Sequence, residues 1–251
     1  MSSTGRPPTI SAASARARAR AARASPVAAA VEAEDIVVVD ERAGTVAIRI
    51  YRPSRHEDPL PTLIYARGAD HGAGGDELAR ALAVGSGVAV ALPDHSSPTA
   101  AAPPAAVERC YAAAAWAAGH GHARGLDGGR LAVGGDATGA VLAIALALLA
   151  SERGGPSLAC QLLLCPVVDS SVPEVDDLPP ALVITADGDA ACGHGEAYAA
   201  RLRAAGVTVI GVRYQGVGAG FLRSDPPREL AVTGAAIEQA AGFLASALAT
   251  R

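Results

Sequence analysis

Residues 131–140, Leu-Ala-Val-Gly-Gly-Asp-Ala-Thr-Gly-Ala, constrain the fold of this 251-residue chain more than any other stretch. The apolar residues Leu131–Val133 predict a buried strand, and the apolar run Ala140–Ala150 predicts a helix. Only a glycine-rich turn separates them, so the chain must reverse sharply between strand and helix. A turn of this kind with the frame Gly-x-Ser-x-Gly presents a nucleophilic serine in many enzymes. Here the frame reads Gly-Asp-Ala-Thr-Gly, and its central residue, Ala137, carries no nucleophilic atom.

The composition narrows the class of protein. Half of the residues are hydrophobic but only 3% are aromatic, so we expect a core of Ala, Val and Leu. The formal net charge of −4 argues against a general nucleic-acid binder, which is usually basic. No apolar run has the ~18–20 residues of a membrane span, and residues Met1–Pro8 lack the apolar segment of a secretion signal. We therefore expect a cytoplasmic protein without nucleic-acid or membrane partners. Its four cysteines are then reduced core residues: Cys110, Cys160, Cys165 and Cys192.

Strand and helix patterns alternate along the chain. Residues 1–34, rich in Ala and Arg, predict a helical arm or lid remnant, and residues 35–251 predict one α/β domain. The expected strands are 36–40, 45–51, 61–65, 88–92, 131–133, 159–164, 183–186 and 207–214, and the expected helices are 76–84, 105–119, 140–152, 195–205 and 227–248. Continuous apolar strands are buried on both faces, so these elements predict a mostly parallel central sheet with helices on both faces.

Three further stretches accompany the turn at Ala137: Thr62–Tyr65 with a glycine-rich loop behind it, Leu178–Ala186, and Gly216–Phe221. They resemble the strand before the His-Gly-Gly-Gly motif, the strand leading to the catalytic acid, and the frame around the catalytic histidine of the hormone-sensitive-lipase-like α/β-hydrolases, the bacterial acetyl-esterase family. The resemblance covers roughly residues 30–248 and implies the α/β-hydrolase fold. Residues 170–177 stand where the family has a longer segment over the acyl pocket, which implies a reduced lid.

The resemblance breaks down at the catalytic residues. Ala137 stands at the nucleophile position and Ala219 at the histidine position, while Asp189 stands at the position of the acid. The family's oxyanion loop aligns with Arg67, Gly68, Ala69 and Asp70. Loss of the nucleophile or base of such a triad lowers turnover by roughly 10⁶. Binding and oxyanion donors alone retain ~10³–10⁴ over water.

Polar residues at the carboxyl ends of the strands form the candidate site, because ligands of open α/β sheets bind there. Asp189, Asp70 and His71 are the candidate acid or base groups, and Arg67 suits an anionic group. The candidate substrate-binding residues are Arg67, Gly68, Ala69, Asp136, Ala137, Thr138 and Ala219, and His95 and His194 belong to the same edge. The alternative is structural, with Asp189 held by loop hydrogen bonds, Asp136 part of the scaffold, and a surface ion pair between Arg67 and Asp70.

Other chemistry has less support in the sequence. Thr138 is poorly aimed as a replacement nucleophile, and nothing fixes the geometry of Cys192. No recognisable spacing of His, Cys and carboxylate residues indicates a metal site, and we expect no cofactor.

Three functions stay open. Our main expectation is a non-hydrolytic tailoring catalyst that cyclises, eliminates or isomerises a small molecule in specialised metabolism. The alternatives are a catalytically inactive binding or scaffolding subunit and a weak carboxylesterase with a displaced nucleophile. We also expect a homodimer.

Overall fold

The computed structural model describes residues 30–56, 59–68, 74–95, 103–168, 176–218, 220–222 and 230–249. The strands are β1 (Val31–Asp40), β2 (Gly44–Pro53), β3 (Leu60–Ala66), β4 (Ala89–Pro93), β5 (Leu126–Asp136), β6 (Cys160–Leu164), β7 (Ala181–Gly188) and β8 (Val209–Gly218). The helices are α3 (Gly74–Ser86), α4 (Pro103–His120), α5 (Thr138–Arg153), α6 (Cys192–Ala204) and α7 (Leu230–Ala247), with a 3₁₀ turn η2 (Gly121–Arg124).

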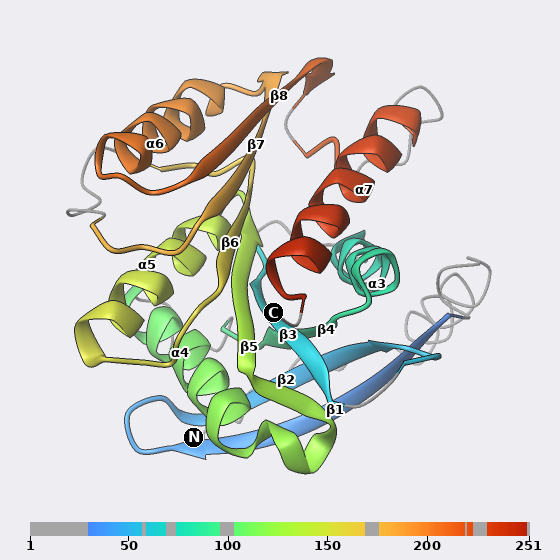
Figure 1. Ribbon diagram of the computed structural model, residues 1–251, viewed down its shortest axis with the longest axis vertical. Coiled ribbons are helices and arrows are strands. Elements are labelled where there is room, and N and C mark those ends of the chain that lie inside the picture. Colours follow the sequence, from blue (N-terminus) through green and yellow to red (C-terminus); the bar gives the residue numbers. More distant parts are fainter. Residues whose placement is uncertain are drawn as a thin grey trace, which may run out of the picture.

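All eight strands form one sheet in the order β1-β2-β4-β3-β5-β6-β7-β8 (Figure 1). The pairs β1–β2 and β2–β4 are antiparallel, and every other neighbouring pair is parallel. Parallel neighbours put their carboxyl ends at one edge of the sheet, which is where the candidate site was expected. The predicted α/β class with a mostly parallel sheet is confirmed.

The helices cover the sheet on both faces. Figure 1 shows α4, α5 and α6 on one side and α3 and α7 on the other. Each side encloses a separate apolar core, one containing Ile144 and Leu202 and the other Leu82 and Leu244. Small residues allow close packing, since a Cβ added to Gly85 of α3 would lie 2.9 Å from the Cβ of Ala241 in α7. Ala, Val and Leu make up most of both cores, as the composition predicts.

The amino-terminal boundary differs from the prediction. Strand β1 begins at Val31, which is paired with Pro53 of β2, so residues 31–34 belong to the sheet rather than to an arm. The sequence concealed this because Glu32 and Glu34 lie on an edge strand, where polar side chains interrupt the apolar pattern. Residues 1–29 lie outside the described part of the chain.

The four cysteines are buried and form no disulfide, as predicted. Burial raises the pKa of the Cys110 and Cys160 thiols to about 12, so both stay protonated at neutral pH. Across the described residues, no helix has the length and apolar character needed to cross a membrane.

Candidate active site

The turn between β5 and α5 has a strained backbone at Ala137. Its φ is 49° and its ψ is −117°, a conformation that residues other than glycine rarely adopt and that costs about 1–3 kcal/mol. The end of β6 fixes this conformation, because the Ala137 N–H donates to the Leu164 carbonyl at 2.9 Å. The predicted sharp turn is therefore present, and it places residue 137 at the carboxyl end of the parallel strands.

Two glycines let this turn approach β3. A Cβ on Gly139 would lie 2.1 Å from the carbonyl oxygen of Ala66 and 2.5 Å from the carbonyl carbon of Arg67. A Cβ on Gly135 would lie 2.4 Å from the carbonyl oxygen of Gly139. Both glycines of the Gly-x-x-x-Gly frame are thus required by close contact between backbones, whatever residue stands at the centre.

Asp136 ties the loop after β3 to the turn. The Gly68 N–H donates to Asp136 Oδ1 at 3.1 Å, and the Asp136 side chain is buried. The structure therefore brings together Gly68 and Asp136, two of the candidate substrate-binding residues. Because Asp136 engages this N–H, Gly68 is not placed to donate it to a substrate. Thr138 begins α5 directly after Ala137, at the position whose backbone N–H serves the oxyanion hole in this kind of turn.

Asp189 lies at the carboxyl end of β7 and begins the turn into α6. Its Oδ1 accepts a hydrogen bond from the Ala191 N–H at 2.8 Å, and its carbonyl accepts one from the Cys192 N–H at 3.0 Å. This is the structural alternative stated for Asp189, and it leaves a catalytic role as a prediction. Asp187, which the sequence analysis missed, accepts a hydrogen bond from the Gly216 N–H at 2.9 Å and anchors β8.

Arg67 has an acidic partner other than the one expected. Its Nη1 lies 3.3 Å from Oδ1 of Asp76, in the first turn of α3. The expected partner, Asp70, falls outside the described residues, as do Ala69, His71 and Ala219. An acidic residue at a helix start is a signal that could have pointed to Asp76, but nothing in the sequence places that helix beside Arg67.

The remaining candidates follow β4 or lie on α6. His95 follows β4, where Arg109 Nε donates to the carbonyl of Asp94 at 2.6 Å, and His194 is exposed on α6. The buried Cys192 thiol donates to Glu196 Oε1, on the same helix, at 3.6 Å. This geometry gives no support to Cys192 as a replacement nucleophile. Among the described residues, no three His, Cys, Asp or Glu side chains gather closely enough to bind a metal ion.

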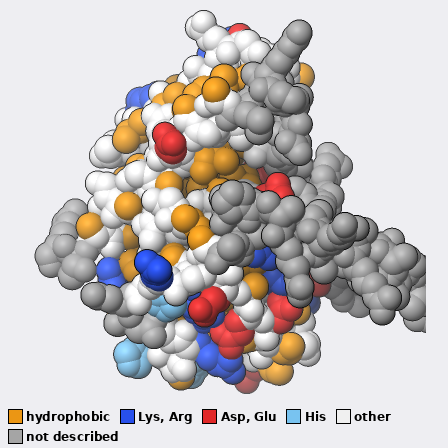
Figure 2. Space-filling model, turned by 90° about the vertical axis from the view of Figure 1, so that its right-hand side faces the viewer, with side chains coloured by type: hydrophobic (Ala, Val, Ile, Leu, Met, Phe, Trp, Pro, Cys, Tyr) orange, Lys and Arg blue, Asp and Glu red, His pale blue; other side chains and the backbone are white. Residues whose placement is uncertain are grey.

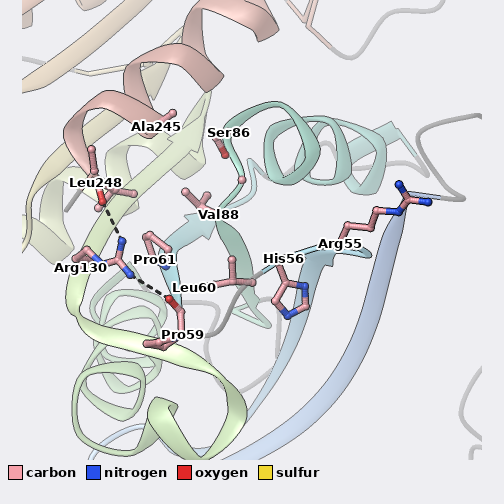
Figure 3. Close-up of a pocket in the computed structure, with 12 residues that line it drawn as sticks. Arg55, His56, Pro59, Leu60, Pro61, Ser86, Val88, Arg130, Ala245 and Leu248 are labelled. Carbon is pink, nitrogen blue, oxygen red and sulfur yellow. Dashed lines mark hydrogen bonds between the residues drawn. The ribbon is translucent and has the colours of Figure 1, made fainter.

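An open cavity of about 500 Å³ lies at the opposite edge of the sheet, at the amino ends of β3 and β4. Figure 3 shows Arg130 beside it, donating to the carbonyl oxygens of Pro59 at 3.0 Å and Leu248 at 3.5 Å. Its Nε donates to Asp127 at 2.6 Å. These bonds connect β5, the loop before β3 and the end of α7, so Arg130 serves the scaffold. The Ala137 edge, where the strained turn lies, therefore stays the candidate active site.

Comparison with protein families agrees with this geometry. Residues 66–176 and 170–223 match the family described as alpha/beta hydrolase fold. The chain belongs to this family. The chain is similar to the solved structure of a thermostable esterase from Pseudomonas putida ECU1011, with 30% identity and a TM-score of 0.83; the match covers 96% of this chain and 92% of that one. It is also similar to the structure of an esterase from Pyrobaculum calidifontis, with 30% identity and a TM-score of 0.79; the match covers 94% of this chain and 92% of that one.

Two curated relatives of this α/β-hydrolase come from Mycobacterium tuberculosis. Esterase LipI is 33% identical over 156 residues, which cover 59% of this chain and 49% of LipI, so the match spans about half of that relative. Carboxylesterase NlhH is 29% identical over 214 residues, which cover 65% of this chain and 67% of NlhH.

These relatives overturn our main functional expectation. They are named esterases and carboxylesterases. They therefore favour the weak carboxylesterase over a tailoring catalyst or a scaffolding subunit. This expectation was wrong because it gave two missing side chains more weight than the backbone around them. The strained turn, its glycine contacts and the Asp136 bond are all present in this chain.

Proposed function

We propose that this chain is a weak carboxylesterase that binds carboxylic esters above Ala137 and attacks them with a group other than residue 137. The observation that carries the proposal is the strained backbone of Ala137 at the carboxyl end of β5. Backbone strain of about 1–3 kcal/mol persists where the surrounding structure enforces it, and it clusters at functional sites. The names of the relatives support ester hydrolysis as the reaction class.

The Thr138 backbone N–H is the donor that supports the oxyanion in this proposal. Donors aimed at the developing negative charge are a large share of catalysis in acyl transfer, and they act whatever the attacking group is. In one route water attacks the ester carbonyl, the C–O bond to the alcohol breaks, and the products are a carboxylic acid and an alcohol. In the other route the hydroxyl of Thr138, an exposed residue beside the turn, displaces the alcohol and forms a Thr138 ester, which water then hydrolyses to release the acid. Without a serine and its base, we expect at most ~10³–10⁴ over the uncatalysed rate.

Hydrolysis of 4-nitrophenyl acetate by the purified full chain tests this proposal. We expect slow turnover above the buffer rate, saturating with substrate. Thr138→Val removes the hydroxyl and keeps the shape. A loss of turnover in this variant assigns the attack to Thr138, and unchanged turnover assigns it to water. Thr45→Val is the matched control, because Thr45 is exposed on β2 and far from the turn in sequence. Hydrolysis at the buffer rate by the full chain would contradict the proposal.

We also propose that the protein acts in the cytoplasm. The four buried cysteines form no disulfide, which supports this location because a reducing compartment keeps thiols from oxidising.

A further inference from the structure

A network of ion pairs extends from β1 and β2 to Arg67, beside the candidate site. Arg49 of β2 donates Nε and Nη2 to the two carboxylate oxygens of Asp35 at 2.7 and 2.8 Å. Its Nη1 lies 3.6 Å from Oδ2 of Asp76, whose other oxygen lies 3.3 Å from Nη1 of Arg67. Asp76 is therefore shared between two guanidinium groups, and Arg67 is the member of the network next to the β5–α5 turn.

This cluster carries more positive than negative charge. Arg80 of α3 lies over the ring of Tyr51, with its guanidinium carbon 4.5 Å from the ring centroid. Burial and the charge of Asp76 raise the pKa of Tyr51, so its hydroxyl stays neutral at physiological pH. The cluster thus contains three arginines, at 49, 67 and 80, and two carboxylates, those of Asp35 and Asp76. Figure 2 shows acidic and basic side chains intermixed below an apolar region on this side of the molecule.

Arg67 has N–H donors that form no hydrogen bond within the described part of the chain. Its single hydrogen bond within the described part of the chain is the 3.3 Å contact from Nη1 to a carboxylate that Arg49 also approaches. Its Nε and Nη2 form no hydrogen bond to a described residue, and a third of its side chain is exposed. A guanidinium edge with two parallel N–H donors fits a carboxylate in a bidentate pair.

The backbone brings Arg67 close to the reacting position. Ala66 is paired with Gly135 in the register of β3 and β5, so Arg67 follows at the level of Asp136, one residue before Ala137. The Arg67 carbonyl carbon also lies within contact distance of Gly139. A ligand seated above Ala137 is therefore within reach of a long side chain that begins at residue 67.

We propose that Arg67 makes the site selective for esters that carry a second, anionic group, the simplest being monoesters of short dicarboxylic acids. The inference rests on the proposed function, since it names the class of ester that the site takes. The free carboxylate of the acyl chain pairs with Nε and Nη2 of Arg67 while the ester carbonyl lies over Ala137.

Binding of two matched amides to the full chain tests the proposal without any need for turnover. N-phenylglutaramic acid carries the carboxylate, and N-phenylpentanamide is a neutral counterpart of the same chain length. By calorimetric titration at low salt we expect the anionic amide to bind at least tenfold more tightly. The preference should shrink as NaCl rises to 0.5 M, since salt screens a partly exposed charge pair.

Three variants locate the effect. Arg67→Gln should abolish the preference, and Arg67→Lys should retain part of it, because the charge remains but the fork is lost. Arg213→Gln should leave it unchanged. Arg213 is the matched control because its Nη1 forms a similar ion pair, 3.4 Å from Glu196. Melting temperatures check that each variant folds.

The outcomes separate the two proposals. Binding of both amides with equal affinity, or a preference that survives in Arg67→Gln, overturns the role of Arg67 and leaves the ester site standing. Binding of neither amide overturns the ester site and this inference together.

Discussion

Ala137 holds a strained backbone conformation at the centre of the candidate site. Its positive φ places an L side chain where steric repulsion opposes it, and its neighbours hold it there through the Leu164 carbonyl and the β3 backbone. The strain therefore belongs to the surrounding structure rather than to the side chain at the centre. Glycine, which has no Cβ, is the residue that this position accepts without strain.

We predict that Ala137→Gly leaves the free energy of unfolding unchanged or raises it by up to about 1 kcal/mol. Relief of the strain opposes the extra entropy that glycine gives the unfolded chain. Urea unfolding of the wild type and variant measures the difference. Ala197→Gly, in the exposed interior of α6, is the control and should lower stability by about 1 kcal/mol. Equal losses in both variants would mean that Ala137 is not strained.

At the scale of elements, the active-site edge depends on three backbones that touch. Strand β3, the turn after β5 and the start of α5 meet at Gly135 and Gly139 without intervening side chains. A methyl group at this contact must displace backbone, which packed strands resist.

Gly139→Ala should therefore lower the free energy of unfolding by at least about 2 kcal/mol. The added Cβ would lie 2.1 Å from the Ala66 carbonyl oxygen. Gly242→Ala is a suitable control, because a Cβ at Gly242 of α7 meets no atom within 4 Å. That control should be stabilised by about 0.5–1 kcal/mol, as expected for glycine replaced in a helix. A Gly139→Ala variant as stable as the wild type would disprove the close contact.

A second prediction at this scale concerns the packing of α4 against α5. Hydrogen bonds from Arg153, at the end of α5, to Glu108 of α4 lower the pKa of Glu108 below its usual 4.5, against the opposing effect of burial. The ion pair thus stabilises the fold above pH 4.5, and this contribution is lost as the pH falls from 4.5 through the pKa in the folded state. The melting temperature of Glu108→Gln should lie below that of the wild type at pH 7, and the difference should vanish near pH 3. Glu41→Gln, in the exposed turn after β1, should show no such pH dependence. A difference that persists at pH 3 would refute this account.

Across the whole molecule, local sequence patterns predicted the sheet and the turn. They did not predict contacts between residues far apart in the sequence. The turn at Ala137 could be predicted because its strand, glycines and helix are contiguous in the sequence. The Arg67–Asp76 pair was not, because it depends on how α3 docks beside β3. Residues 31–34 were misassigned for a similar reason, since only pairing with β2 makes them a strand. The expectation of a tailoring catalyst was wrong because it rested on side-chain identity and not on backbone strain, which the sequence does not display.

We propose that the protein is a homodimer joined through β8. This strand lies at the edge of the sheet with β7 as its neighbour, and Ile210 is 48% exposed. Unpaired edge groups favour addition of a second strand. Light scattering after gel filtration should give twice the mass of the chain. Ile210→Lys should shift the protein toward the monomer, whereas Val39→Lys on the opposite edge strand, β1, should not. A monomeric wild type would reject the proposal.

The most direct test of the central claim, that this chain retains an esterase site without its nucleophile and base, is to restore both groups. The variant Ala137→Ser/Ala219→His should hydrolyse 4-nitrophenyl acetate with a kcat/KM on the order of 10²-fold or more above the wild type and either single variant, because the two groups act as a unit. Ala197→Ser, on the exposed face of α6, should have no effect. A folded double variant that is no faster than the wild type would contradict the account.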